Sequence, residues 1–254
     1  MMGMNVDLTA RKILALLHDP PFKPILFASY SGRDVAELVR HATGIGEEEY
    51  RGERMEEYHE KLARYIIDEL VKKLAGSGRY DLAAKIKSMQ EECRPLIDKC
   101  DYASSSIDRS IAYLFFEGGL GARKFVNRLV FKHPLDSSEH EFTDKVRRLL
   151  YDGKGALRVE EFATAVKSFI SLVSEAMVRA EPGYEYHALW RVLPASYVYS
   201  LEKAFDIKIP EATLLPADTR SPTSTIIDHL YATASLATAV ADNEIGLIYW
   251  EIEG

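Results

Sequence analysis

His18 and Asp19 form the stretch of this sequence most suited to chemistry, because they place an imidazole beside a carboxylate. They follow an apolar helical run and precede Pro20 and Pro21. Since proline cannot continue a helix, we expect the pair at a helix C-terminus, where a turning backbone lets both side chains converge on one ion. Imidazole and carboxylate together suit manganese, nickel, iron or zinc. The pair alone favours the alternative, a capping histidine beside a solvated aspartate.

An aspartate in the middle of the chain needs a partner if it is buried. Asp101 precedes the small residues 103–106, which allow another helix to approach closely. A metal ion would balance its charge, and the free N–H groups at the start of a helix would also satisfy it. Of the two, the sequence favours Asp101 as a helix N-cap.

Two further histidines could lie in the site, in the core or on the surface. His229 lies on the first turns of a helix expected over about 225–240, whose small residues permit packing in the middle of a bundle. It would point inward with that face, and taken alone it is better explained as a hydrogen-bonded core histidine than as a metal ligand. His59 lies among charged residues and is predicted to be on the surface.

Lys23 follows the His-Asp pair, in a loop expected over residues 20–32. Its ammonium group could reach a phosphate, and a solvated loop lysine is an equal alternative.

Hydrophobic periodicity predicts a mainly α protein in which any sheet is small. The expected helices cover the apolar run up to Leu17 and about 33–42, 47–75, 80–90, 138–151, 158–180, 184–204 and 225–240. Segment 184–204 is expected to be helical on both sides of Pro194. Strands are expected only at 125–133 and 246–252.

The composition fits one large or two small domains with a sizeable core, since 47% of the 254 residues are hydrophobic. Two cysteines, Cys93 and Cys100, are too few for a disulfide framework, fit a reducing cytoplasm and are expected in the core. No apolar run approaches the roughly 20 residues that span a bilayer, so no membrane partner is expected. The net charge of −7 argues against a free-standing nucleic-acid binder. A nuclease that relies on a metal or on partner subunits remains compatible with it.

Three motifs together carry a family resemblance. They are Leu-His-Asp-Pro-Pro-Phe-Lys at 17–23, Cys-Asp-Tyr-Ala-Ser-Ser at 100–105, and Leu-Pro-Ala-Asp-Thr-Arg at 215–220 followed by His229 and Thr233. In this order they resemble the N-terminal part of the large polymerase-like subunit of type III-B CRISPR effector complexes, the Cmr family.

The resemblance implies a circularly permuted HD-phosphohydrolase-like helical bundle with small β elements. The permuted domain would cover residues 1–242, and residues 243–254 would begin the first strand of a following polymerase-like domain. In the permuted order the His-Asp pair comes first, a lone Asp second and the lone His last. The implied metal ligands are His18, Asp19, Asp101 and His229.

The activity implied by the resemblance is metal-dependent cleavage of single-stranded DNA in type III CRISPR antiviral defence. Manganese or nickel is the expected ion, with iron, zinc or magnesium as alternatives. Lys23 and Arg220 would contact phosphate, and Asp218 would orient a ligand histidine. The implied partners are single-stranded DNA, other effector subunits and the guide RNA complex, in the cytoplasm.

The sequence departs from the family pattern at one place, and this difference favours another function. Related sequences often carry Asp-His where this chain has Thr223 and Ser224. The alternative is therefore an HD-like scaffold that helps to assemble the effector complex and whose catalytic activity is weak or lost. The Gly-Gly-Asp-Asp centre of the family's polymerase-like domain is absent from this sequence.

Overall fold

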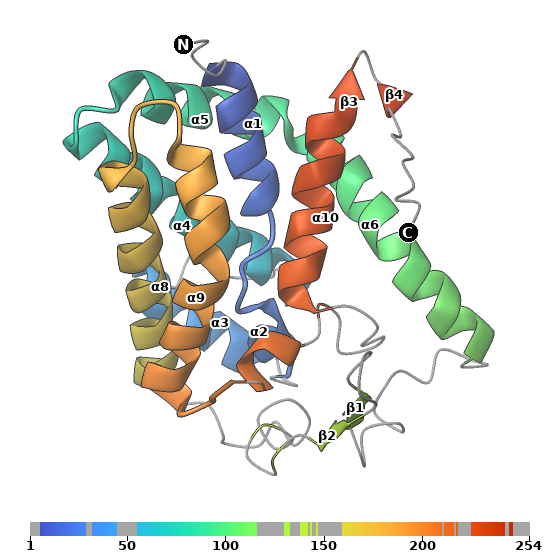
Figure 1. Cartoon of the computed structure of the whole chain (residues 1–254). Helices are drawn as coiled ribbons and strands as arrows, with labels where there is room; N and C mark the ends of the chain where they lie inside the picture. The colour runs from blue at the N-terminus through green and yellow to red at the C-terminus, as the bar shows by residue number, and fades with distance from the viewer. Residues whose placement is uncertain are drawn as a thin grey trace.

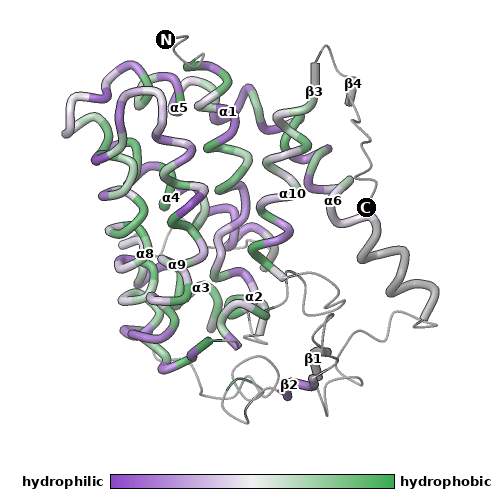
Figure 2. Tube along the Cα trace, viewed as in Figure 1, coloured by the Kyte–Doolittle hydropathy of each residue, from purple (hydrophilic) through white to green (hydrophobic). Residues whose placement is uncertain are grey.

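The described part of the chain is mainly helical (Figure 1). The computed structural model describes residues 6–28, 32–44, 55–115, 130–132, 138–141, 143, 146, 159–209, 211–215, 217, 225–241 and 244–245. The helices are α1 (Val6–Leu16), α2 (Lys23–Ala28), α3 (Gly32–Thr43), α4 (Met55–Gly76), α5 (Tyr80–Glu92), α6 (Arg94–Phe115), α8 (Val159–Arg179), α9 (Glu185–Phe205), the 3-10 helix η4 (Glu211–Leu214) and α10 (Ile226–Ala239). In Figure 2 hydrophobic and hydrophilic stretches alternate along the helices, as expected when each buries one face.

Helix α1 lies in the middle of the bundle, between α9 and α10 (Figure 1). Its core-facing side chains recur at helical spacing, and Ala10, Ile13 and Leu14 are all but fully buried. Burying a large aliphatic side chain contributes about 1.5–3 kcal/mol, so this stripe fixes the helix firmly. The helix ends at Leu16, and the predicted exit before Pro20 is confirmed.

Phe22 anchors the chain just after the His-Asp pair. Its ring is fully buried and meets Phe162, Phe169 and Tyr197 edge-on, with ring centroids 5.7–6.0 Å apart. These partners lie on α8 and α9, which pack side by side as an antiparallel pair. An aromatic cluster therefore anchors the segment that follows α1 to helices α8 and α9.

Helix α6 packs against α10, which separates it from α1 (Figure 1). The prediction that Asp101 is an N-cap was wrong, because α6 already begins at Arg94 and Asp101 lies inside it. Pro95 falls in the first helical turn, where a missing N–H costs nothing. The prediction of buried cysteines is confirmed, since Cys93 and Cys100 are 5% and 1% exposed.

Two other element predictions were wrong. Part of the loop expected at 20–32 forms helix α2, because Pro24 is tolerated in the first turn and Ile25 and Leu26 are buried. The helix expected at 138–151 gives way at residues 139–141 to strand β2. There the backbone hydrogen bonds of a paired strand outweigh local helix propensity.

The described sheets are small, as predicted. Strand β1 (Val130–Lys132) pairs antiparallel with β2 (Glu139–Glu141), and Phe131 lies opposite His140. Strand β3 (Val240–Ala241) pairs antiparallel with β4 (Glu244–Ile245). The strand expected at 246–252 and the domain boundary expected at 242–243 lie outside the described residues.

Other helix predictions are confirmed within a few residues, including α3, α5, α8, α10 and a continuous α9 that contains Pro194. Helix α4 ends at Gly76, and Gly78 beyond it has a φ of +88°, which favours glycine. Among the described helices, none is both long and apolar enough to cross a membrane.

Candidate metal centre

The His-Asp pair lies directly beyond the last turn of α1, where the backbone turns toward Phe22. The Nδ1 atom of His18 lies 2.8 Å from the carbonyl oxygen of Ala15. Because a carbonyl can only accept, Nδ1 donates this hydrogen bond, and Nε2 is the ring nitrogen turned toward the other side chains of the site. Asp19 is 3% exposed, so its carboxylate is enclosed by protein.

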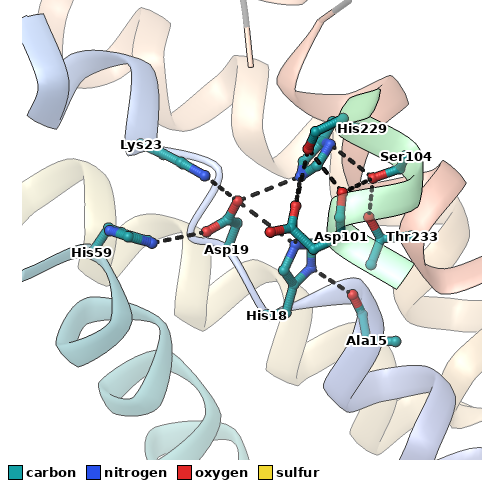
Figure 3. Close-up of polar contacts among 10 residues, drawn as sticks. Ala15, His18, Asp19, Lys23, His59, Asp101, Ser104, His229 and Thr233 are labelled. Carbon is teal, nitrogen blue, oxygen red and sulfur yellow. Dashed lines mark hydrogen bonds and ion pairs between the residues drawn. The ribbon is translucent and has the colours of Figure 1, made fainter. Parts of the chain in front are cut away.

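Four side chains from three distant segments converge on one point (Figure 3). His18 and Asp19 come from the end of α1, Asp101 from α6 and His229 from α10. Each offers one ligand atom, and these atoms lie within 4.8 Å of one another. The rings of His18 and His229 have centroids 5.4 Å apart, so the two histidines of the ligand set that the resemblance implied lie side by side.

The individual distances describe a compact cluster. The Nε2 atom of His229 lies 3.0 Å from Oδ1 of Asp101 and 3.4 Å from Oδ2 of Asp19. The Nε2 atom of His18 lies 3.7 Å and 3.6 Å from the same two oxygens. Ligands of a common ion are typically separated by such distances, because each would lie about 2.0–2.6 Å from it.

The donor set fits a divalent cation. The Nε2 atoms of His18 and His229 are buried, and neither has a partner in hydrogen-bond geometry among the described residues. A buried nitrogen without such a partner is costly unless something else satisfies it. Two carboxylates supply the charge that balances a divalent ion, and nitrogen with oxygen suits a transition metal better than the all-oxygen shells preferred by magnesium.

The charged groups of the cluster shift one another's pKa values. Burial alone would raise the pKa of Asp19, but the Lys23 ammonium and His18 hold it well below its usual range. Burial likewise opposes ionisation of Asp101, yet its contacts with His18 and His229 hold its pKa low. Burial would lower the pKa of His229, but the carboxylates of Asp101 and Asp19 raise it to about 9. The site therefore keeps both carboxylates ionised and favours a positive charge between them.

Lys23 lies in the first turn of α2, where it contacts the cluster directly. Its Nζ atom lies 2.5 Å from Oδ2 of Asp19, and its side chain is 19% exposed. This placement differs from a solvated loop lysine and leaves the ammonium group at the edge of the site. The other expected phosphate contact, Arg220, lies outside the described residues, as do Asp218, Thr223 and Ser224.

The prediction that His59 lies on the surface was wrong. Its side chain is 16% exposed, and its Nε2 atom lies 3.3 Å from Oδ1 of Asp19, the carboxylate oxygen turned away from the other ligands. Burial lowers the pKa of His59, although Asp19 opposes the shift. A signal was present, because His59 precedes the buried Leu62 and Ile66 at the spacing of a single helix face.

Hydroxyl groups surround the ligands on the α6–α10 side. Ser104 contacts Nδ1 of His229 at 3.2 Å and Oγ1 of Thr233 at 2.8 Å. Ser105 donates to the backbone carbonyl of Asp101 at 2.8 Å and approaches its carboxylate Oδ1 at 3.2 Å. The sequence indicated only that these small residues let two helices approach closely, because no pattern in it pairs α6 with α10.

The chain is similar to one curated protein over most of its length. It is 26% identical over 226 residues, or 89% of the chain, to the CRISPR system CMR subunit Cmr2 of Saccharolobus solfataricus. The chain spans 17% of the length of that relative. No protein-family model matches the chain, and no solved structure matches it. The match supports a relationship to Cmr2-like CRISPR subunits, in agreement with the motif resemblance.

Proposed function

We propose that this chain is a metal-dependent phosphodiesterase that cleaves single-stranded DNA in type III CRISPR antiviral defence. It would work in the cytoplasm, within a complex of other effector subunits and guide RNA. Residues 1–242 would form a circularly permuted HD-like domain, followed by the start of a polymerase-like domain. The similarity to Cmr2 supports the CRISPR setting.

One observation carries the catalytic part of the proposal. Two buried imidazole Nε2 atoms, neither in hydrogen-bond geometry with any of the described residues, face two carboxylates inside a cluster of four potential ligands. The ligands follow one another as His18-Asp19, then Asp101, then His229, which is the order that a permuted HD fold requires. Manganese or nickel is the proposed ion, because imidazole and carboxylate ligands suit both.

The residues around the cluster have separate tasks in this proposal. His18, Asp19, Asp101 and His229 hold the ion, which when bound lowers the pKa of water and offsets charge on the scissile phosphate. Lys23, at the edge of the site, orients a phosphate of the substrate through its ammonium group. Arg220 supplies a second phosphate contact, and Asp218 helps to orient a ligand histidine.

The decisive experiment incubates the purified chain with labelled single-stranded DNA across a panel of divalent metals. We expect cleavage with manganese or nickel and none after chelation. The double variant His18→Ala/Asp19→Ala should lose cleavage while its circular-dichroism spectrum stays intact. His41→Ala, which removes an exposed histidine at the end of α3, is the matched control and should cleave normally. Undiminished cleavage by the double variant would place the activity elsewhere.

The alternative function is an HD-like scaffold for assembly of the effector complex. It is favoured by Thr223 and Ser224, which stand where related sequences often have Asp-His, and by the net charge of −7. A scaffold should purify without stoichiometric metal, and manganese should not stabilise it. Metal content of the purified chain therefore separates the two functions before any activity is measured.

A further inference from the structure

We propose that Ser104 is a positioning residue that holds His229 in the tautomer needed to ligate the metal. This inference rests on the proposed metal centre and extends it to a residue outside the ligand set. Ser104 comes from α6, and its hydroxyl group lies behind the His229 ring, on the side opposite the ligand cluster (Figure 3).

The hydroxyl group of Ser104 has three polar neighbours and a single hydrogen to donate. The Oγ atom of Ser104 has one hydrogen and two lone pairs. It lies 2.9 Å from the carbonyl oxygen of Asp101, which can only accept, so the hydroxyl hydrogen is donated there. The remaining contacts of this oxygen, to Thr233 Oγ1 at 2.8 Å and His229 Nδ1 at 3.2 Å, must then be donated toward it.

This count assigns the proton positions of His229. Its Nδ1 atom carries a hydrogen and donates to Ser104, so Nε2 is the nitrogen that can bind an ion between Asp101 and Asp19, giving up to the solvent any proton that it carries in the metal-free site. The opposite tautomer would place an N–H in the ligand cluster and two lone pairs face to face at Ser104. A hydrogen bond to the outer ring nitrogen commonly sets which nitrogen binds a metal.

Thr233 completes the arrangement from the next turn of α10. It is fully buried, and its Oγ1 atom lies 2.8 Å from Oγ of Ser104. Because the hydrogen of Ser104 is donated to the Asp101 carbonyl, Thr233 is the donor in this contact. Ser104 is thereby held between its own helix and α10. His18 differs, because its Nδ1 atom donates to a backbone carbonyl that no side-chain substitution removes. Ser104 is therefore the side chain through which a ligand tautomer can be tested.

The test measures manganese affinity by titration calorimetry for the whole chain and three variants. Ser104→Ala should weaken binding by roughly 10- to 100-fold, the usual cost of losing the outer partner of a ligand histidine. Thr233→Val keeps the buried shape and should weaken binding less, because Ser104 can still accept from His229. Ser106→Ala is the matched control, since Ser106 is exposed on the same helix and donates only to the Ala103 carbonyl. It should bind as the wild type does.

A second measurement reads the tautomer directly. In the zinc-loaded, nitrogen-15-labelled protein, His229 should show a slowly exchanging Nδ1–H and a metal-bound Nε2. Ser104→Ala should lose the slow exchange of that proton. This spectrum needs no catalytic activity, and the wild-type spectrum decides the tautomer even if a variant fails to fold.

The outcomes separate this inference from the proposed function. Wild-type protein that binds no metal would overturn both. Wild-type protein that binds manganese, with Ser104→Ala binding equally well, would overturn only the role of Ser104. A metal-bound Nδ1 in the zinc-loaded wild type would also overturn it while leaving the metal centre intact.

Discussion

At the scale of single residues, the two oxygens of Asp19 have different surroundings. Oδ2 faces the ligand cluster and Lys23, whereas Oδ1 faces His59 on α4. A carboxylate held at both oxygens cannot rotate away from an ion, so its outer partner matters to binding although it lies outside the ligand set. His59 thus links α4 to the site, a connection that no motif in the sequence indicates.

We predict that His59→Leu weakens manganese binding by about 10-fold, because Asp19 loses the partner of its outer oxygen. His59→Gln keeps an N–H donor and should recover part of the loss. Titration calorimetry measures both, with His187→Leu, an exposed histidine on α9, as the control. Equal affinity in His59→Leu and the wild type would show that His59 contributes only packing.

The residues of the site differ in how far the sequence could reveal them. The prolines after His18 and Asp19 placed the pair correctly at a helix end, but the pair alone favoured a capping histidine beside a solvated aspartate. Asp101 and His229 became candidate metal ligands only through their order in the family resemblance. Taken alone, Asp101 was better explained as a helix cap and His229 as a core histidine. Ser104 and His59 could not be paired with their contacts, because helix packing determines which faces meet and periodicity shows only that a face is buried.

At the scale of elements, the site depends on how α1 and α2 are joined. The short connection carries His18 and Asp19, and Phe22 fixes its far end among the rings of α8 and α9. Helices with strong periodicity, such as α8, were predicted closely. Helix α2 was missed because Pro20, Pro21 and Pro24 indicated a loop. Strand β2 was missed because strand pairing depends on a partner elsewhere in the sequence.

We predict that Phe22→Ala lowers the free energy of unfolding by about 3–5 kcal/mol, the usual cost of emptying an aromatic core position. Metal binding should weaken as well, because the segment that holds Asp19 loses its anchor. Chemical denaturation and calorimetry measure the two effects. Tyr199→Ala, which removes a half-exposed ring from α9, is the control. It should change the free energy of unfolding and the metal affinity far less. A stable Phe22→Ala protein would mean that the aromatic cluster does not hold this segment.

At the scale of the whole molecule, the sequence lacks the parts needed for nucleotide polymerisation. It has no Gly-Gly-Asp-Asp centre and no glycine-rich phosphate loop. We therefore predict that this chain alone forms no cyclic oligoadenylate from ATP. Chromatography of the reaction products checks this, with ATP and each metal of the cleavage panel. Any product formed by pure protein would contradict it.

The ligand cluster also joins parts of the molecule that are far apart in sequence. His18 and Asp19 follow α1, Asp101 belongs to α6 and His229 to α10, and these helices pack next to one another. An ion held by all of them is bound by the folded chain and has no equivalent site in the unfolded one. Metal binding must then stabilise the whole bundle, and this linkage can be measured without any substrate.

We predict that manganese at about 100 times its dissociation constant stabilises the protein by about 2.7 kcal/mol. For a chain of this length that corresponds to a rise in melting temperature of roughly 5–10 °C. Magnesium should give a smaller shift, because it prefers oxygen-rich ligand shells. His229→Ala should strongly reduce the shift at the same manganese concentration, since two carboxylates and one imidazole bind the ion less tightly, whereas His41→Ala should retain it. If manganese, nickel, iron and zinc all leave the melting temperature of the wild-type protein unchanged, the protein has no working metal centre. The scaffold function would then be the better explanation.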